Sequence, residues 1–316
     1  MPPRGITAPA RASQTTSTTS EKPDLVELTY QWRRIPGTAP NSTCCGIVDH
    51  RSNGTGTVNG TIEGHDHYPW MAALVDASGE HWGGTPFCGG ALINDRYILT
   101  ATHCVNWWPS PQWGQVILGK RETFRSSETE LRLNVLRIIL HPEFYANILH
   151  NDIALLELET PLDLPVGDNF IAPICMPQLR RKYYNDEAQM VGWGLHGFKA
   201  NPASEESRPP VLRSVPMRTM RIGRCSYRII KTTGKIFVVT PSTVCAEAID
   251  TAAGACWGDS GSPLTVADQD EPLRRILLGL AIWTVRPCHT PSPDVFVKIP
   301  KYLDWIITNT ENANYC

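Results

Sequence analysis

The sequence Ala255-Cys256-Trp257-Gly258-Asp259-Ser260-Gly261-Ser262-Pro263 places a serine between two glycines. A serine hydroxyl is a poor nucleophile at neutral pH unless a base takes its proton and hydrogen-bond donors stabilise the oxyanion that forms. Gly258 and Gly261 let the backbone turn tightly and aim its N–H groups at one point. The stretch therefore indicates a nucleophilic serine or an ordinary turn. The choice depends on whether the chain also supplies a base, an orienting acid and a pocket.

Length and charge limit the class of protein. The chain has 316 residues, enough for one large β-type domain or two smaller ones with a packed core. Its formal net charge of −2 indicates no attraction to nucleic acid or to a membrane surface. Because no run of about 18 apolar residues occurs, we expect no membrane-spanning helix.

Ten cysteines are spread from Cys44 to Cys316 without a CxxC pair or zinc-finger spacing. This pattern favours a disulfide framework formed in an oxidising compartment over metal ligands or free thiols. We therefore expect a secreted, extracellular protein whose export signal is missing from this chain, since residues 1–20 contain no apolar core of a signal peptide. Asn-X-Thr triplets at Asn41, Asn53 and Asn59 are compatible with a glycoprotein.

Composition divides the chain into three parts. Residues 1–43 are polar, lack a periodic apolar pattern and are expected to form a flexible N-terminal tail or linker. Residues 44–56 begin with Cys44 and Cys45, which are badly placed to bond to each other and are expected to anchor this segment to two different places. Residues 57–316 are expected to form the folded domain.

Short apolar runs alternate with turn residues in the folded domain. Many short strands at such spacing are typical of an antiparallel barrel or sandwich. Residues 302–307 are the exception, because they follow Pro300 and predict an amphipathic helix. The runs that we interpret as strands are residues 70–75, 90–93, 97–100, 116–119, 131–135, 153–158 and 277–283.

Two further segments offer a base and an acid for Ser260. His103 ends an apolar strand beside Cys104, and a bridge from Cys104 to Cys88 would clamp the loop that carries the histidine. Asp152 lies at the edge of a strongly apolar run, where a buried carboxylate needs a partner. An imidazole N–H would be suitable, and a salt bridge to an arginine is the alternative.

Three blocks, in this order, resemble the signature motifs of the chymotrypsin/trypsin-like serine endopeptidases: Thr100-Ala101-Thr102-His103-Cys104, Asn151-Asp152-Ile153-Ala154-Leu155-Leu156 and Gly258-Asp259-Ser260-Gly261-Ser262-Pro263. The resemblance covers residues 57–308. It implies an all-β fold of two six-stranded antiparallel β-barrels with a C-terminal α-helix, and an active site in the cleft between the barrels. Supporting matches are Tyr68-Pro69-Trp70, Cys88-Gly89-Gly90-Ala91-Leu92-Ile93, Pro173-Ile174-Cys175-Met176-Pro177, Gly192-Trp193-Gly194 and Tyr302-Leu303-Asp304-Trp305-Ile306.

The resemblance also implies the role of each site residue. Ser260 would be the nucleophile, His103 the general base and then acid, and Asp152 the residue that orients the imidazole. The N–H groups of Gly258 and Ser260 would form the oxyanion hole. The implied reaction is peptide hydrolysis through an acyl-enzyme, without a metal or cofactor. The implied partners are protein or peptide substrates and protein protease inhibitors.

A disulfide pattern follows from the same resemblance. Cys175 would be bonded to the amino-terminal segment, through Cys44 or Cys45, and the other member of that doublet is left for Cys316. Such bonds would keep the segment attached after an activation cleavage. The remaining pairs would be Cys88–Cys104, Cys225–Cys245 and Cys256–Cys288.

Many relatives carry one further bridge, at the positions that Ala188 and Val266 occupy here. Both cysteines are missing together, so no orphan thiol is left. This consistency supports the alignment.

Two positions of the primary specificity pocket depart from the family pattern. The residue six before the serine, where an acid selects Arg or Lys, is Gly254, and Asp294 occupies another position that faces the pocket base. This pair resembles crab collagenolytic serine proteases, whose specificity is broad; the alternative is that Asp294 faces water. Trp283 and Thr284 belong to the pocket mouth, which Thr284 would narrow as in elastase-like enzymes, and Ile282 removes a hydroxyl that usually helps to hold the triad acid. Specificity stays open between basic, broad and small apolar side chains, and we favour broad specificity.

Activation is the weakest part of the match. The new amino terminus of the family would be Thr57, whose α-ammonium would pair with buried Asp259, but the residue before it is Gly56 rather than Arg or Lys. The nearest upstream basic residue is Arg51. An alternative hypothesis follows, in which the chain is a weakly active or inactive protease homologue that acts as a binding or cofactor module.

Two other segments bear on ligands. Lys120 stands where trypsins carry a calcium-binding carboxylate, so we expect no calcium there and expect Glu130 to be the partner of Lys120. Residues 106–113 contain three tryptophans next to His103, which indicates a macromolecular contact or packing onto the barrel.

Overall fold

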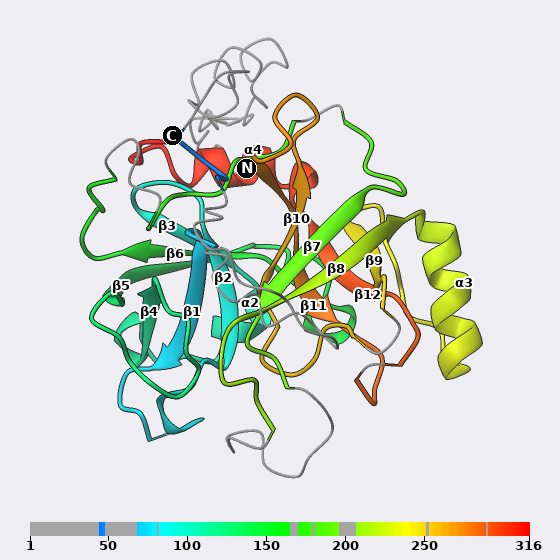
Figure 1. Cartoon of the computed structure of the whole chain (residues 1–316), viewed down its shortest axis with the longest axis horizontal. Helices are drawn as coiled ribbons and strands as arrows, with labels where there is room; N and C mark the ends of the chain where they lie inside the picture. The colour runs from blue at the N-terminus through cyan, green and yellow to red at the C-terminus, as the bar shows by residue number, and fades with distance from the viewer. Residues whose placement is uncertain are drawn as a thin grey trace, which may run out of the picture.

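Two closed barrels of six antiparallel strands lie side by side in the computed structural model (Figure 1). The structure describes residues 44–47, 68–80, 82–164, 170–178, 181–195, 207–250, 253–288 and 290–316. The expected all-β fold with two six-stranded barrels is confirmed. Residues 1–43, Thr57 and the three Asn-X-Thr triplets lie outside the described residues.

The first barrel closes because β1 pairs with both β2 and β4. All residues of β1, β2, β3 and β6 are buried, as the apolar runs predicted, whereas β5 is exposed along most of its length. The strand order is β1-β2-β3-β6-β5-β4. The strands are β1 (Met71–Asp76), β2 (Cys88–Leu92), β3 (Tyr97–Thr100), β4 (Gly114–Leu118), β5 (Leu131–Leu140) and β6 (Ala154–Leu158).

The second barrel has the order β10-β11-β12-β9-β8-β7 and closes through the pairing of β10 with β7. Fully buried Trp193 and Phe296 are among its largest core side chains. The apolar run 277–283 forms most of β11, as predicted. The strands are β7 (Glu187–Gly192), β8 (Arg213–Met220), β9 (Thr243–Ala248), β10 (Pro263–Ala267), β11 (Arg275–Trp283) and β12 (Asp294–Lys298).

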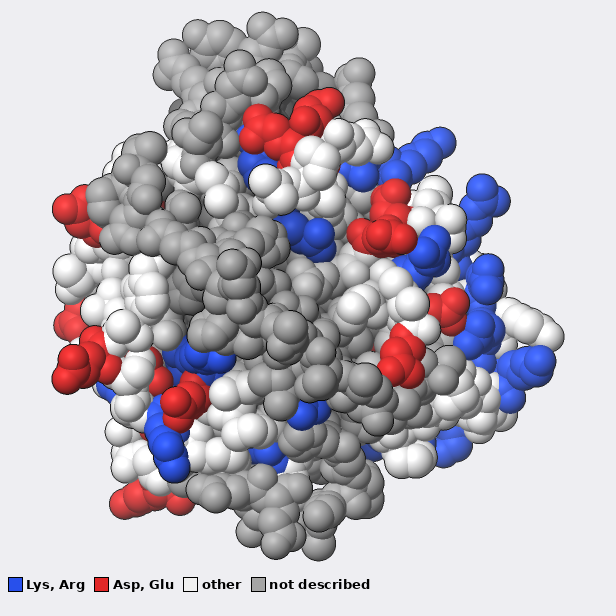
Figure 2. All heavy atoms as spheres, viewed as in Figure 1, with Lys and Arg blue, Asp and Glu red and all other residues white. Residues whose placement is uncertain are grey.

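Helices lie outside the barrels. The expected carboxyl-terminal helix is α4 (Leu303–Thr308), which follows Pro300. The sequence analysis did not predict α3 (Ile222–Thr233), which ends where Gly234 adopts a left-handed conformation with φ 68°. Among the described residues no helix has the length and apolar character needed to cross a bilayer. In Figure 2, Lys and Arg side chains gather along the edge that α3 occupies in Figure 1.

All ten cysteines form disulfides, and the implied pairs are confirmed. The open choice is resolved, because Cys45 bonds to Cys175 and Cys44 bonds to Cys316. Gly46 reinforces this attachment: its N–H donates to the Pro173 carbonyl at 2.9 Å, and its own carbonyl accepts from the Arg275 N–H at 2.7 Å. Residues 44–47 are therefore fixed against the second barrel.

The expected pair of Lys120 and Glu130 is present. The Lys120 Nζ lies 3.0 Å from the Glu130 Oε1, and both side chains are 2 % exposed. The ammonium also donates to the Arg125 carbonyl at 3.1 Å. The loop after β4 is thus held by an internal cation bonded to oxygen atoms of the protein.

Ala188 and Val266 provide a test of the strand register. They face each other directly across β7 and β10, and both side chains lie in the same core cluster. Directly opposed residues of an antiparallel pair have Cα atoms about 4.5–5.5 Å apart, within the range of a disulfide. We predict that the double variant A188C/V266C forms a sixth disulfide, detected as a mass 2 Da lower before reduction, where two hydrogens are lost per bond. The single variant A188C should keep one alkylatable thiol, and two free thiols in the double variant would contradict this register.

Candidate active site

Strand pairing brings the end of β3 next to the start of β6. The two strands are antiparallel, with Thr100 opposite Ala154. His103 follows β3 on the short helix α2 (Thr102–Val105), and Asp152 stands two residues before β6. Two segments separated by 49 residues in sequence are therefore adjacent in space.

The Asp152 carboxylate accepts two hydrogen bonds from His103. The ring Nδ1 lies 2.6 Å from Oδ2, and the backbone N–H donates to Oδ1 at 2.8 Å. The Asp152 side chain is fully buried, whereas 28 % of the His103 side chain is exposed. A second link, in which the Thr102 hydroxyl donates to the Ile153 carbonyl at 2.7 Å, ties α2 to the chain beside Asp152. The imidazole is thus held in one orientation, and its Nε2 lies 4.0 Å from the Cys104 Sγ.

Ser260 lies in the turn before β10, on the second barrel. Its carbonyl accepts the N–H of Gly89, in β2 of the first barrel, at 2.8 Å. Gly261 has φ 76°, and a Cβ at this position would collide with the Gly89 carbonyl and the Thr100 hydroxyl. Glycine is needed at 261 because the turn docks against the backbone of the other barrel.

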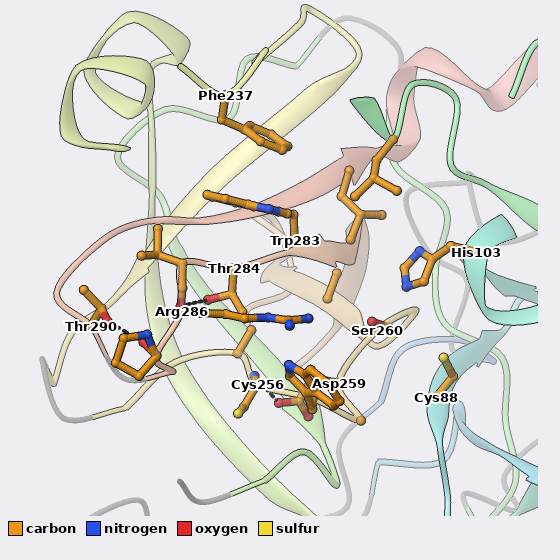
Figure 3. A pocket seen from close by; sticks show the side chains of 18 of the residues that line it. Cys88, His103, Phe237, Cys256, Asp259, Ser260, Trp283, Thr284, Arg286 and Thr290 are labelled. Atoms are coloured by element: carbon orange, nitrogen blue, oxygen red, sulfur yellow. Dashed lines mark hydrogen bonds between the residues drawn. The ribbon is translucent and has the colours of Figure 1, made fainter. Parts of the chain in front are cut away.

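Ser260 and His103 line one pocket of about 1060 Å³, whose walls come from both barrels. Figure 3 shows the Ser260 hydroxyl lying toward the His103 ring. Gly258 also lines the pocket, with φ 98°. Within the described part of the chain, the N–H groups of Gly258 and Ser260 donate to no protein acceptor. Cys88 and Cys104 lie beside His103 but are bonded to each other, so they are not available as metal ligands.

Asp259 is a buried carboxylate directly behind the Ser260 turn. Its Oδ1 accepts the Gly194 N–H at 2.8 Å, and its Oδ2 accepts the Cys256 N–H at 2.9 Å. Burial raises the pKa of Asp259 to about 6, although these two hydrogen bonds and the charge of Arg208 oppose that shift. The carboxylate is therefore costly to keep ionised and holds the turn through backbone donors.

Gly192 and Gly194 are required by Asp259. A Cβ on either glycine would collide with the Asp259 carboxylate. Sequence analysis identified Gly192-Trp193-Gly194 only as a supporting match. The two small residues flanking a tryptophan were the available signal of a close backbone approach.

Arg208 connects the two barrels behind the same turn. Its Nη1 donates to the Pro86 carbonyl at 2.6 Å, and it lies 3.4 Å from the Trp193 carbonyl. The side chain is 1 % exposed and lies against Gly258. Burial lowers the pKa of Arg208, and the Asp259 charge opposes this shift. Sequence analysis missed this residue, since it belongs to no motif.

Of the expected specificity residues, Trp283 and Thr284 line the pocket, whereas Gly254 and Asp294 are not among its lining residues. Asp294 is 3 % exposed, so the alternative in which it faces water is wrong. Its Oδ2 accepts the Ala255 N–H at 2.9 Å. Burial raises the pKa of Asp294 to about 7, opposed by hydrogen bonds from Ala255 and from the Thr284 hydroxyl, and the nearby Asp259 charge adds to the rise.

Arg286 and Phe237 are pocket residues that sequence analysis did not identify. Arg286 is exposed, and its guanidinium lies 4.3 Å from the ring centre of Trp257. Phe237 stacks on Trp283, with ring centres 4.1 Å apart. The available signal was its position in sequence, because Arg286 lies between Thr284, which was expected at the pocket mouth, and Cys288, which was expected in a disulfide.

The tryptophans of residues 106–113 differ in burial, so packing onto the barrel is confirmed for Trp108 alone and a macromolecular contact stays a prediction. Trp108 is buried against the barrel, whereas Trp107 is 47 % exposed and lines the pocket. Phe87 and Trp113 complete the cluster, with Trp107 and Trp113 ring centres 4.5 Å apart. One side of the pocket is therefore aromatic.

The burial of Asp294 predicts a pH-dependent cost. The pKa of Asp294 is about 7 in the folded state, and its ordinary value is 3.8. Between these two pH values the folded state therefore keeps a proton that the unfolded state has released. The stability that protonated Asp294 contributes is fully present below about pH 4. It is lost as the pH rises through 7, and the free energy of unfolding falls by about 1 kcal/mol per pH unit over that range. We predict that D294N gains stability relative to the natural protein from pH 4 to pH 7, measured by urea unfolding. Parallel stability curves would contradict a raised pKa at this position.

Comparison with known proteins agrees with this geometry. The family model described as Trypsin matches residues 57–306. "Transmembrane protease serine 9" of Rattus norvegicus is 28 % identical over 86 % of this chain and 24 % of its own length. "Vitamin K-dependent protein C" of Mus musculus is 30 % identical over 79 % of this chain and 50 % of its own length. "Serine protease 56" of Mus musculus is 30 % identical over 79 % of this chain and 38 % of its own length.

The chain spans half or less of the length of these three relatives. The family model nevertheless covers most of the chain, including both barrels and the pocket between them. The chain belongs to the trypsin family of serine proteases.

Proposed function

We propose that this chain is a secreted serine endopeptidase that hydrolyses peptide bonds through an acyl-enzyme on Ser260. The observation that carries the proposal is the 2.6 Å contact between Asp152 and the Nδ1 of His103, in a pocket that also contains Ser260. A base oriented by a buried acid and facing a serine is the arrangement that activates a hydroxyl for attack on a carbonyl.

The hydrogen bond to Asp152 assigns the proton positions on His103. A carboxylate is an acceptor, so Nδ1 carries the proton and Nε2 is free to take the proton of Ser260. Attack by Ser260 on the substrate carbonyl then leaves a positive imidazolium beside the negative carboxylate. His103 returns the proton to the leaving amine, and water repeats the sequence to release the acyl group.

The N–H groups of Gly258 and Ser260 are the donors that we assign to the oxyanion. They are unpaired within the described residues, and both belong to the turn that Asp259 holds from behind. A lost donor of this kind costs about 3 kcal/mol of transition-state stabilisation. The backbone bonds of Asp259 would therefore contribute to catalysis by fixing the turn.

Activation is proposed to retain the amino-terminal segment. The bonds Cys44–Cys316 and Cys45–Cys175 hold residues 44–47 on the second barrel, so a cut near Thr57 would leave this piece attached. The new α-ammonium is the proposed partner of Asp259. The five disulfides support extracellular location, and protein substrates and protein protease inhibitors are the proposed partners.

A specific serine label tests the proposal against the inactive-homologue alternative. We predict that a fluorophosphonate labels the protein, expressed as the full chain through the secretory pathway, at Ser260. The variant S260A should not be labelled, whereas S110A, at an exposed serine outside the pocket, should be labelled like the natural protein. An unlabelled protein, before and after proteolytic processing, would support the binding or cofactor module instead.

The role of Asp152 gives an independent prediction. In D152N the amide would donate to the imidazole or leave it in the wrong tautomer, so we expect kcat to fall by about 10⁴-fold while the fold is kept. The measurement is kcat on a peptide substrate, with D304N, an exposed carboxylate on α4, as the matched control. A D152N enzyme within tenfold of the natural kcat would exclude the proposed role.

A further inference from the structure

Arg286 occupies the pocket wall next to the proposed nucleophile. Figure 3 shows its side chain extending across the pocket below Thr284, with the guanidinium end toward Ser260. The wall segment is fixed at both ends, since β11 ends at Trp283 and Cys288 is bonded to Cys256. The charge of Arg286 is therefore presented to the space that a substrate side chain would enter.

The contacts of Arg286 leave its hydrogen-bond donors free. The guanidinium lies over the Trp257 ring, with its Cζ 4.3 Å from the ring centre. A contact through the guanidinium face leaves the in-plane N–H groups available for an acceptor. Among the residues that the structure describes, no carboxylate forms an ion pair with Arg286.

The other charged groups of the described pocket wall have the same sign or are already bonded. Arg208, Lys235 and Arg286 line the pocket, and Asp259 is the only acid among the described residues of its wall. Arg208 is 1 % exposed and its charge is opposed by that of Asp259, so Lys235 and Arg286 are the cations that a substrate would meet. Asp259 is buried and its oxygens accept backbone N–H groups. The pocket is therefore a cationic environment for a substrate.

Asp294 does not provide the negative charge that a basic substrate needs. It is 3 % exposed and is not among the residues that line the pocket, and its carboxylate accepts hydrogen bonds from the Ala255 N–H and the Thr284 hydroxyl. The expectation of broad specificity depended on this acid facing the pocket. Thr284 and Arg286 do line the pocket.

The approach to the pocket is also positive. Residues 221–235, which include α3, contain five basic residues and no acidic one. Ile229, Thr232 and Thr233 of α3 and Lys235 beyond it line the pocket. Part of this charge is balanced, because Arg228 pairs with Glu247 at 3.0 Å, whereas Lys235 has no acidic partner among the described residues.

We propose that Arg286 is a specificity-determining residue that selects peptides with an acidic side chain immediately before the bond attacked by Ser260. The carboxylate of Asp or Glu would accept the free in-plane N–H groups of Arg286, forming a charge-assisted hydrogen bond. Arg and Lys substrates would meet a like charge. This inference rests on the proposed function for cleavage, but the binding preference can be measured without it.

Cleavage is tested with peptides that differ only at the residue before the cut. The processed full chain is assayed with Asp, Glu, Asn, Arg and Ala at that position, each variant normalised by fluorophosphonate labelling. We expect kcat/KM for Asp or Glu to exceed that for Asn by about tenfold or more. R286A should lose the preference, R286E should favour Arg, and R132A, which changes an exposed arginine of β5 outside the pocket, should behave like the natural protein.

Binding is tested in the S260A variant, which cannot acylate. Product peptides ending in Asp, Asn or Arg are titrated by calorimetry, and the Asp peptide should bind about tenfold more tightly than the Asn peptide, with the difference lost in S260A/R286A. Tighter binding of the Asp peptide, together with no fluorophosphonate labelling of Ser260 in the natural protein, would overturn the proposed function and keep this inference. Labelling without any preference for acidic residues, in cleavage and in binding, would overturn this inference alone.

Discussion

The hydrogen bond between Asp152 and His103 depends on the pairing of β3 with β6, and the rest of the site is arranged around it. Antiparallel register places the two residues together within the first barrel. Ser260 comes from the second barrel, so the two barrels must be held at a fixed distance. The bond from Gly89 to the Ser260 carbonyl and the bond from Arg208 to the Pro86 carbonyl both cross between them. The catalytic geometry is therefore a property of the interface between two separately closed barrels.

Two buried carboxylates next to Ser260 and the segment before it, Asp259 and Asp294, oppose the stability of the fold. Burial raises the pKa of Asp259 to about 6 and that of Asp294 to about 7, so keeping either carboxylate ionised at neutral pH costs folding stability. Each is stabilised by backbone N–H donors, and those bonds shape the segment 255–260 that carries Ser260. Functional sites commonly keep such locally unfavourable groups, because the surrounding core supplies enough stability to hold them.

Sequence reasoning reached the residues that belong to short motifs. His103 and Asp152 were predictable because each lies at one end of an apolar run, and Ser260 because it lies among glycines in a short motif. The apolar runs indicated an antiparallel barrel or sandwich, and the resemblance implied the two barrels. The partner of Cys45 was not predictable, since adjacent cysteines are equivalent in sequence and the choice depends on how Gly46 bonds to Pro173 and Arg275. The burial of Asp294 and the orientation of the Arg286 side chain depend on how the pocket wall packs, and no local sequence pattern predicts that packing. Helix α3 was missed because its buried stripe is narrow, with only Cys225 and Ile229 of its twelve residues buried.

The central claim is that Ser260 becomes acylated. The most direct measurement is mass spectrometry of the secreted, processed chain quenched in acid after incubation with an activated ester. The account predicts an acyl adduct on the peptide that contains Ser260, formed within one turnover and removed by water at neutral pH. An unmodified Ser260 peptide, or an adduct on another residue that persists in S260A, would contradict it.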